Sequence, residues 1–301
     1  MTDTMLSARR LPPRAQARRS VRVLAQLALL AGVALACGGC ASLFGGVGQG
    51  LAAGIRGHDD PQTVAEALPA YLLLLDGLLI DRPDSKPLLA AAAELNATYA
   101  GSFIAQPERA RKLSRRGLDY ARRLICKQDA ALCRALDGPV DEFQAVLQPC
   151  DAHSADAMFS LGNAWATYIQ ANAQDWSAIA ALPKVESLIR CVIELQPNRD
   201  QGMPWVVLGV LSSLRPAAVG GEPERAAQAF QRAIEMSAGR NLMAKTLYAE
   251  YYARSVFDRE LHDRLLREVS EADPVAPELT LANVMARQRA KELMETADDY
   301  F

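Results

Sequence analysis

Apolar side chains recur along most of this chain with the three- to four-residue spacing of an α-helix. No run of four or more alternating apolar and polar residues predicts a strand. Alanine and leucine are abundant and aromatic residues scarce, which suits helices better than sheets. The segments with helical spacing are 70–80, 86–104, 107–126, 156–171, 183–195, 203–214, 223–237, 242–255, 259–272 and 281–297. The pattern therefore predicts an all-α protein.

The segment 70–80 differs from the other predicted helices because it is apolar on nearly all sides. We expect such a helix to be buried on several faces. It is too short to cross a membrane, which requires about 20 residues of α-helix. The stretch up to residue 149 that follows the third predicted helix is less regular and predicts no long helix.

Three of the predicted helices begin alike. Pro107-Glu-Arg-Ala matches Pro223-Glu-Arg-Ala, and the helix that starts at Pro183 keeps the same apolar spacing. Proline suits the first helical position because no amide hydrogen is needed there. The three prolines are 76 and 40 residues apart, close to multiples of the unit length of helix-turn-helix repeats once short insertions are allowed. The spacing predicts helical hairpins that resemble degenerate tetratricopeptide repeats.

Two glycines occupy similar places in the helices that precede two of these prolines. Gly162 and Gly209 would let neighbouring helices approach closely, because glycine has no side chain. A hairpin repeat cannot bury its apolar face alone, so neighbouring repeats stack and leave a concave inner surface. We expect that concave surface to be the binding surface.

The first forty residues have the composition of a bacterial lipoprotein signal peptide. Six arginines and one acidic residue precede a 14-residue apolar segment, 23–36, which is too short to span a bilayer. The sequence Gly38-Gly39-Cys40 resembles a lipobox, at which the cysteine is acylated and the leader is removed. Cys37 is a competing site. Cys40 is preferred because Gly-Cys-Ala-Ser resembles the start of many mature lipoproteins.

The predicted organisation has three parts: a signal peptide at 1–39, the acylated cysteine with a glycine-rich tether at 40–60, and a helical domain at 61–301. An aspartate at position 41 would argue against sorting to the outer membrane, and this chain has alanine there. We therefore expect a periplasmic protein that is lipid-anchored to the outer membrane. The chain has 33 basic and 35 acidic residues. Cleavage of the leader would remove six basic residues and one acidic residue, so the mature part would have a formal net charge of −7. This charge argues against a nucleic-acid partner.

A search for catalytic motifs finds no G-x-S-x-G, no phosphate-binding loop and no H-E-x-x-H. Asp258 and His262 are four residues apart on one helix face, and we expect a hydrogen-bonded surface pair because two ligands do not make a metal site. Together with Arg254, Arg259, Asp263 and Arg264 they predict a solvated, salt-bridged face. No catalytic residue, cofactor or metal is predicted, and the protein is expected not to be an enzyme.

Four cysteines remain after processing, in a compartment that permits disulfides: Cys126, Cys133, Cys150 and Cys191. On one straight helix the α-carbons of Cys126 and Cys133 would lie about 10.5 Å apart, too far to bond. They could pair if the helix breaks near Lys127. The sequence leaves open whether a bridge forms, and whether it is Cys126–Cys133 or Cys150–Cys191.

The three tryptophans are candidate ligand contacts because they combine apolar area with a polar group. Trp205 is expected in the core. Trp165 and Trp176 remain candidates for a functional role. Trp176 follows Asn172-Ala-Gln-Asp175, a segment typical of a loop, which would expose its ring to a ligand or a neighbouring protein.

Several segments together resemble the T component associated with TRAP transporters, the TatT family of periplasmic lipoproteins with cryptic tetratricopeptide repeats. They are Tyr71-Leu-Leu-Leu-Leu-Asp76-Gly77, Gly162-Asn-Ala-Trp165, Asp175-Trp176, Ala181-Leu-Pro-Lys-Val-Glu186, Gly220-Gly221-x-Pro223-Glu224, Gly239-Arg-Asn241-Leu242, Tyr248-Ala-Glu250-x-Tyr252-Ala-Arg254 and Phe257-Asp-Arg-Glu-Leu-His262-Asp-Arg-Leu-Leu266. The resemblance covers most of the chain after residue 70. The arginine-rich leader and the four cysteines named above are not assigned to the family pattern.

The resemblance implies a non-enzymatic helical protein that docks a periplasmic solute-binding protein of a TRAP uptake system. It also implies a protomer with a pore or funnel, the capacity to form a homotrimer, and a hydrophobic or organic-acid ligand. The candidate ligand- or partner-binding residues are Trp165, Trp176, Lys184, Glu186, Asn241, Tyr251, Arg254 and Asp258. The alternative is a repeat lipoprotein that scaffolds envelope or outer-membrane protein assembly. A continuous apolar channel would favour transport, and an open charged groove would favour scaffolding.

Overall fold

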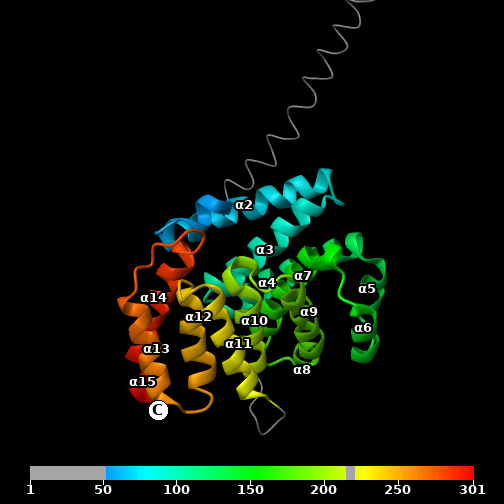
Figure 1. Cartoon of the computed structure of the whole chain (residues 1–301). Coiled ribbons are helices and arrows are strands. Elements are labelled where there is room, and N and C mark those ends of the chain that lie inside the picture. Colours follow the sequence, from blue (N-terminus) through cyan, green and yellow to red (C-terminus); the bar gives the residue numbers. More distant parts are fainter. Residues whose placement is uncertain (1–51, 215–220) are drawn as a thin grey trace, which may run out of the picture. The chain divides into compact units, whose positions relative to one another are not determined.

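A computed structural model describes residues 52–214 and 221–301 of the chain (Figure 1). The predicted signal peptide, Cys37, Cys40 and the first part of the predicted tether lie outside the described residues. The chain divides into two compact units, 1–55 and 56–301. Residues 52–56 are helical, within the segment for which the glycine content predicts a flexible tether.

The described part contains helices and no strand, which confirms the predicted all-α class. The longer helices are α2 (Pro61–Asp81), α3 (Lys86–Ser102), α4 (Pro107–Gln128), α7 (Ala155–Ala171), α9 (Leu182–Leu195), α10 (Met203–Ser213), α11 (Pro223–Met236), α13 (Arg259–Glu271) and α14 (Thr280–Glu295). The shorter ones are α5 (Ala130–Ala135), α6 (Val140–Leu147), η1 (Ala152–Ser154), α8 (Trp176–Ile179), η2 (Arg199–Gly202), α12 (Leu242–Leu247), η4 (Tyr248–Ala253) and α15 (Ala297–Tyr300).

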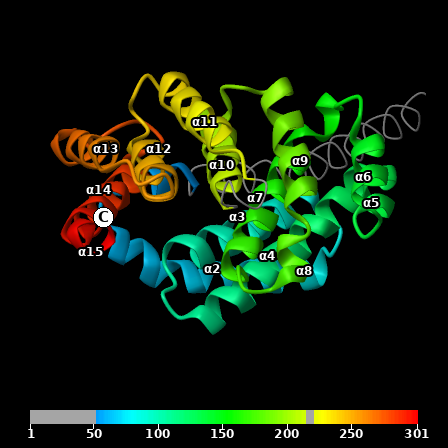
Figure 2. The ribbon, with the colours of Figure 1, turned by 90° about the horizontal axis from the view of Figure 1, so that it is seen from below.

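Consecutive helices pack as antiparallel pairs, as the repeat pattern predicts. The pairs are α3 with α4, α7 with α9, α10 with α11 and α13 with α14, and neighbouring pairs stack through α4 on α7 and α9 on α10 (Figure 2). Two clusters of buried side chains result, one from α2 to α11 and one from α10 to α14. The helix α10 contributes Val207, Leu208 and Leu211 to the first cluster and Val206 to the second, so it joins them.

Proline sets the first turn of six helices. The predicted starts at Pro107, Pro183 and Pro223 are confirmed at the first or second helical position. The same arrangement is found in α2, α3 and α10. Because the fixed φ of proline suits the helix and its missing N–H leaves no unpaired donor there, each proline fixes where its helix begins.

The two glycines predicted to allow close helix approach do so. A Cβ atom at Gly162 would lie 2.7 Å from Cδ1 of Ile189 in α9. A Cβ atom at Gly209 would lie 2.9 Å from three ring carbons of Phe230 in α11. Contacts this short do not occur between real side chains, so a methyl group at either position would force Ile189 or Phe230 to move.

The segment predicted to be irregular forms α5 and α6, a short pair inserted between α4 and α7. The break falls at Asp129, whose carboxylate accepts hydrogen bonds from the first amides of α5. This break brings the α-carbons of Cys126 and Cys133 to 4.7 Å, and both disulfides form, Cys126–Cys133 and Cys150–Cys191. The inserted pair is therefore tied to the repeats on both sides, to α4 by one bridge and to α9 by the other.

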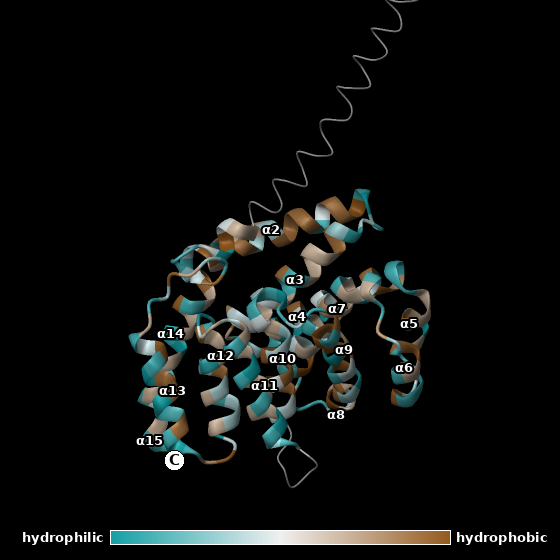
Figure 3. Ribbon diagram, in the orientation of Figure 1, coloured by the Kyte–Doolittle hydropathy of each residue, from teal (hydrophilic) through white to brown (hydrophobic). Residues whose placement is uncertain are grey.

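The expectation that 70–80 is buried on several faces is wrong. The helix α2 starts earlier, at Pro61, after the capping residue Asp60, and it accommodates Pro69 in its interior. One face is buried, with Val64, Leu68, Leu72 and Leu79 spaced by whole helical turns. The opposite face of the second half is exposed, and Figure 3 shows how apolar α2 is along this part. An apolar composition on all sides does not by itself supply packing partners on all sides.

Candidate binding site

A hollow of about 240 Å³ opens between α4, α7 and the segment from α8 to the start of α9. Its lining combines charged, aromatic and small apolar residues. They are Arg115, Leu118, Asp119 and Arg122 from α4, Trp165 and Tyr168 from α7, and Ser177, Ala178 and Ala181 from the α8–α9 segment. The α4 residues share one face because they are spaced by three or four positions.

The two arginines of the hollow are held by defined partners. The guanidinium of Arg115 lies 5.3 Å from the ring centre of Tyr168, and its Nη2 donates to the Tyr168 hydroxyl at 3.2 Å. The Nη2 of Arg122 lies 2.6 Å from both carboxylate oxygens of Asp137. These contacts use one terminal nitrogen of each guanidinium, and each guanidinium has five N–H donors in total. The rim can therefore still donate hydrogen bonds to an anion.

Trp165 forms the buried wall of the hollow. Its side chain is 6% exposed and meets the ring of Phe143 edge to face at 6.4 Å between ring centres. On the other side of this layer, Lys184 lies 5.5 Å from the Phe143 ring centre. Its Nζ donates to the carbonyl oxygens of Leu136 at 2.8 Å and Gly138 at 2.5 Å.

Lys184 is therefore a structural residue that holds the turn between α5 and α6. Burial lowers the pKa of its ammonium group, since desolvation disfavours the charged form. Two carbonyl acceptors and the aromatic face compensate the charge. Lys184 does not line the hollow, and its role in ligand binding stays a prediction.

Trp176 is 83% exposed, which agrees with the expectation of an exposed ring. It begins the one-turn helix α8 instead of lying in a loop, because the carboxylate of Asp175 accepts hydrogen bonds from the amide and hydroxyl of Ser177. These hydrogen bonds lower the pKa of Asp175, and Arg115 of the hollow adds a smaller effect in the same direction. The next residue in the chain, Ser177, lines the hollow, whereas Trp176 itself does not.

The chemistry of the hollow suits a small molecule with an apolar body and an acidic group. Trp165, Leu118 and two alanines offer apolar contact, while Arg115 and Arg122 offer donors that match a carboxylate. The carboxylate of Asp119 in the same lining would repel a ligand that carries several negative charges.

Three other predicted residues lie away from this hollow. Glu186 pairs with Arg190 on the surface of α9 at 3.7 Å. Asn241 is completely buried before α12, and neither polar atom of its side chain has a hydrogen-bond partner among the described residues. Tyr251 accepts a hydrogen bond from Gln170 of α7, and burial raises the pKa of its phenol.

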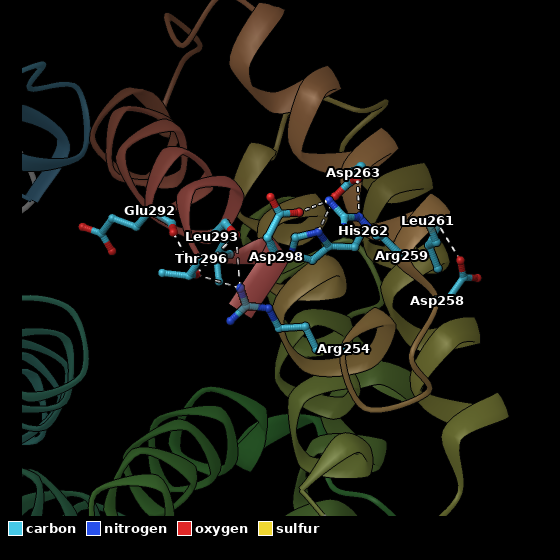
Figure 4. A network of polar contacts seen from close by, with 10 residues as sticks. All are labelled: Arg254, Asp258, Arg259, Leu261, His262, Asp263, Glu292, Leu293, Thr296 and Asp298. Atoms are coloured by element: carbon cyan, nitrogen blue, oxygen red, sulfur yellow. Dashed lines mark hydrogen bonds and ion pairs between the residues drawn. The ribbon is translucent and has the colours of Figure 1, made fainter. Parts of the chain in front are cut away.

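Arg254 and Asp258 belong to a polar network at the C-terminal helices (Figure 4). The Nη2 of Arg254 donates to the carbonyl of Leu293 at 3.1 Å and to the hydroxyl of Thr296 at 3.0 Å, so it fastens the end of α14. Asp258 caps α13 by accepting from the amide of Leu261 at 2.9 Å. Both residues stabilise helix ends, and neither lines the hollow between α4 and α7.

The expected surface pair of Asp258 and His262 is wrong. His262 is completely buried, its Nδ1 lies 2.8 Å from Asp263, and its ring meets Phe301 edge to face (Figure 4). Four-residue spacing placed both residues on one side of α13, but Asp258 is used at the start of the helix and the imidazole turns inward. Arg259, in contrast, pairs with Asp263 and Asp298 at the surface as expected.

The eight candidate residues therefore do not converge on one site. Of the eight, only Trp165 is among the residues that line the hollow. Trp176 is next to the lining residue Ser177 in the sequence, and Lys184 lies near Phe143, which packs against Trp165. The residues that sequence analysis missed are Arg115, Asp119, Arg122 and Tyr168. The available indication was the high density of arginine on the polar side of α4. Among the described residues, no three histidine, cysteine or acidic side chains gather as they would around a metal ion.

Comparison with known proteins gives two matches. The family model described as TRAP transporter T-component matches residues 57–301. A distant relative, an uncharacterized protein of Treponema pallidum (strain Nichols), is 22% identical over 262 residues, which cover 81% of each chain. The matched range includes every helix that lines the hollow.

Proposed function

The chain belongs to the TRAP transporter T-component family, and from this membership we propose that it binds the periplasmic solute-binding protein of a TRAP uptake system. The family is a transporter accessory component and not a known enzyme family. Within the general role of a transporter component, we infer that this chain docks a solute-binding protein. This inference agrees with the apolar and cationic lining of the hollow and with the exposure of Trp176.

The observation that carries the proposal is the position of Trp176. A tryptophan that is 83% exposed is unusual on a free surface, because its large apolar ring gains free energy when a partner covers it. Tryptophan, tyrosine and arginine are the residues that most often dominate the free energy of protein association. Here Tyr168 and Arg115 line one hollow, and Trp176 directly precedes Ser177, which lines it as well.

The same hollow supports the second part of the proposal, a small organic-acid or hydrophobic ligand. Its volume of about 240 Å³ suits a metabolite, and its two guanidinium groups suit a carboxylate. Docking at Trp176 would place the mouth of a solute-binding protein beside this hollow. Transfer of a solute between the two proteins would then require only a short path.

The proposed location is the periplasm, with the chain attached to the outer membrane through an acylated Cys40. Two disulfides agree with an extracytoplasmic protein. Two or more acyl chains give stable membrane attachment, whereas one gives only reversible binding. The proposed assembly state, a homotrimer, follows from the family resemblance alone.

The alternative function, a scaffold for envelope assembly, is favoured by the charged rim of the hollow. Arg115, Asp119 and Arg122 would suit a polar peptide segment as well as a small acid. The two functions differ in the partner, so identification of the partner decides between them.

Replacing Trp176 by alanine is expected to weaken binding of the solute-binding protein about 30-fold, the loss of roughly 2 kcal/mol typical of a central tryptophan. The melting temperature should stay nearly unchanged because the ring contributes little to the core. The measurement is calorimetric titration of the mature chain with the solute-binding protein of the same organism's TRAP system, together with thermal unfolding.

The matched control is Phe257→Ala, since Phe257 is an aromatic residue that is 70% exposed on a different segment. This variant should bind as the native chain does. Equal weakening by both variants would remove Trp176 from the interface. A large loss of thermal stability in Trp176→Ala would show that the ring packs in the core and is not part of a binding surface.

Replacing Cys40 by serine is expected to leave an uncleaved precursor without lipid, because acylation requires the thiol. The matched control is Cys37→Ser, which should be processed normally. Metabolic labelling with a fatty-acid analogue and electrophoretic mobility report both steps. Normal acylation of the Cys40→Ser variant would show that Cys37 is the acylated residue.

A further inference from the structure

The helix α2 carries an apolar stripe that no other element of residues 52–214 and 221–301 covers. The stripe consists of Ala70, Leu73, Leu74, Gly77 and Ile80, which recur at three- and four-residue intervals along one side of the helix. Leu73 is 71% exposed, Leu74 is 56% exposed and Ile80 is 80% exposed. Nothing lies within 4 Å of the position that a Cβ atom of Gly77 would take. Three aliphatic side chains side by side on a surface mark a place of contact.

The stripe is confined to the second half of α2. On the same side of the first half, the exposed residues are Gln62, Thr63 and Glu66. The opposite side of the helix is fixed to the domain, since Asp76 pairs with Arg116 at 2.7 Å and accepts from the Tyr120 hydroxyl at 2.5 Å. The helix is long and apolar enough to cross a membrane by composition. Crossing would break these contacts and place the Asp76 charge in hydrocarbon, which costs several kcal/mol.

We propose that the α2 stripe lies on the phospholipid surface to which the chain is anchored, with its aliphatic side chains at the boundary between headgroups and acyl chains. This inference rests on the proposed acylation of Cys40. Twenty residues separate Cys40 from Pro61, the first residue of α2. A chain of 20 residues spans at most about 70 Å even when fully extended. The anchor therefore keeps α2 near the bilayer and raises the effective concentration of the membrane surface at the stripe.

The chemistry of the stripe selects lipid over the other occupants. A stable contact with a second copy of the chain would bury roughly 800 Å² on each partner, more than five side chains of one helix supply. The stripe contains no basic residue, so contact depends on apolar insertion and not on attraction to anionic lipid. Once tethered, a surface too small for independent binding is sufficient.

The test places an environment-sensitive NBD fluorophore on Leu73→Cys in the processed, acylated full chain, reconstituted in phosphatidylcholine vesicles. We expect a shift of emission to shorter wavelength and quenching by lipids brominated on the acyl chain. The matched control carries the fluorophore on Asp299→Cys, an exposed position in α15, and should show neither. Replacing part of the lipid with phosphatidylglycerol, or raising the salt concentration, should leave the Leu73 result unchanged.

Flotation of the vesicles separates this inference from the proposed acylation. A chain that floats with the vesicles while the Leu73 fluorophore stays in water would overturn the inference and leave the anchor intact. If the chain does not float, a hexahistidine segment in place of Cys40, bound to nickel-chelating lipid, supplies the anchor, and the Leu73 emission again decides.

A second measurement excludes a role in self-association. In the triple variant Leu73→Gln, Leu74→Gln, Ile80→Gln, a fluorophore placed at Gly77→Cys should no longer be quenched by the brominated lipids. When both proteins carry only one acyl chain as their anchor, this variant should dissociate from the vesicles about tenfold faster than the native chain. Its oligomeric state in analytical ultracentrifugation should equal that of the native chain. Dissociation of an oligomer by these substitutions, with unchanged release from vesicles, would assign the stripe to a second copy of the chain.

Discussion

Replacing both Cys150 and Cys191 by alanine is expected to lower the free energy of unfolding by about 4 kcal/mol. The bridge closes a loop with a sequence separation of 41, and the conformational entropy that a disulfide removes from the unfolded chain grows with loop length. Alanine avoids burying a hydroxyl group at position 191, where the side chain is buried beside α6. Urea unfolding followed by circular dichroism, under oxidising conditions, measures the loss.

The matched control is the second bridge. Replacing Cys126 and Cys133 by alanine should cost less, about 2.5 kcal/mol, because their separation is only 7. Reduction of the native chain should cost about as much as both double variants together. Equal losses from the two pairs would show that strain or residual structure in the unfolded chain, and not loop length, sets the contribution of each bridge.

Replacing Phe230 by alanine is expected to cost about 3–5 kcal/mol, because its ring is completely buried in the second core and stacks on Tyr248. Gly209→Ala should also destabilise, by about 1–3 kcal/mol, since its methyl group would meet the Phe230 ring at 2.9 Å. In the double variant the new methyl group enters the space that the ring has left. The double variant should therefore lose about 1–2 kcal/mol less than the sum of the single losses.

Chemical unfolding of the four proteins completes this cycle. The matched control for a glycine in a helix is Gly77→Ala in α2, where no atom lies within 4 Å of the new methyl group. That substitution should stabilise the chain by roughly 0.5–1 kcal/mol through helix propensity. Additive losses at Gly209 and Phe230 would contradict the close approach of α10 and α11.

The sequence predicted the repeating part of the fold well, for physical reasons. Helix starts were predictable because proline at the first turn is a local property, seen at Pro107, Pro183 and Pro223. The close approach at Gly162 and Gly209 was predictable because the two glycines recur in equivalent helices. Periodicity within each segment and similarity between segments point to the same structure, so the expected hairpins agree with the observed ones.

Features that depend on distant partners were not predictable. The expected burial of 70–80 was wrong because the sequence gives the polarity of α2 but not the number of helices that pack on it. The pair of Asp258 and His262 was wrong because α13 uses Asp258 as its cap. The sequence did not decide whether either disulfide forms. Cys126 and Cys133 can pair because the helix breaks at Asp129, and Cys150 and Cys191 pair because the fold brings together two segments that are distant in the sequence.

The candidate site shows the same division. Exposure of Trp176 was predictable from the turn-forming residues before it. The hollow was not, because Arg115 and Arg122 come from a helix that lies about fifty residues earlier in the chain than Trp165. An arginine-rich helix predicts a solvated face, and only the packing of α4 on α7 gives that face an aromatic wall.

The most direct test of the proposed function is capture of partners from the native periplasm. The acylated chain, tagged at its C-terminus, would be cross-linked in its own cell envelope, extracted in mild detergent and analysed by mass spectrometry beside the Trp176→Ala variant. The proposal predicts enrichment of a TRAP-type solute-binding protein with the native chain and its loss with the variant. Recovery of envelope-assembly proteins without a solute-binding protein would contradict it and favour the scaffold.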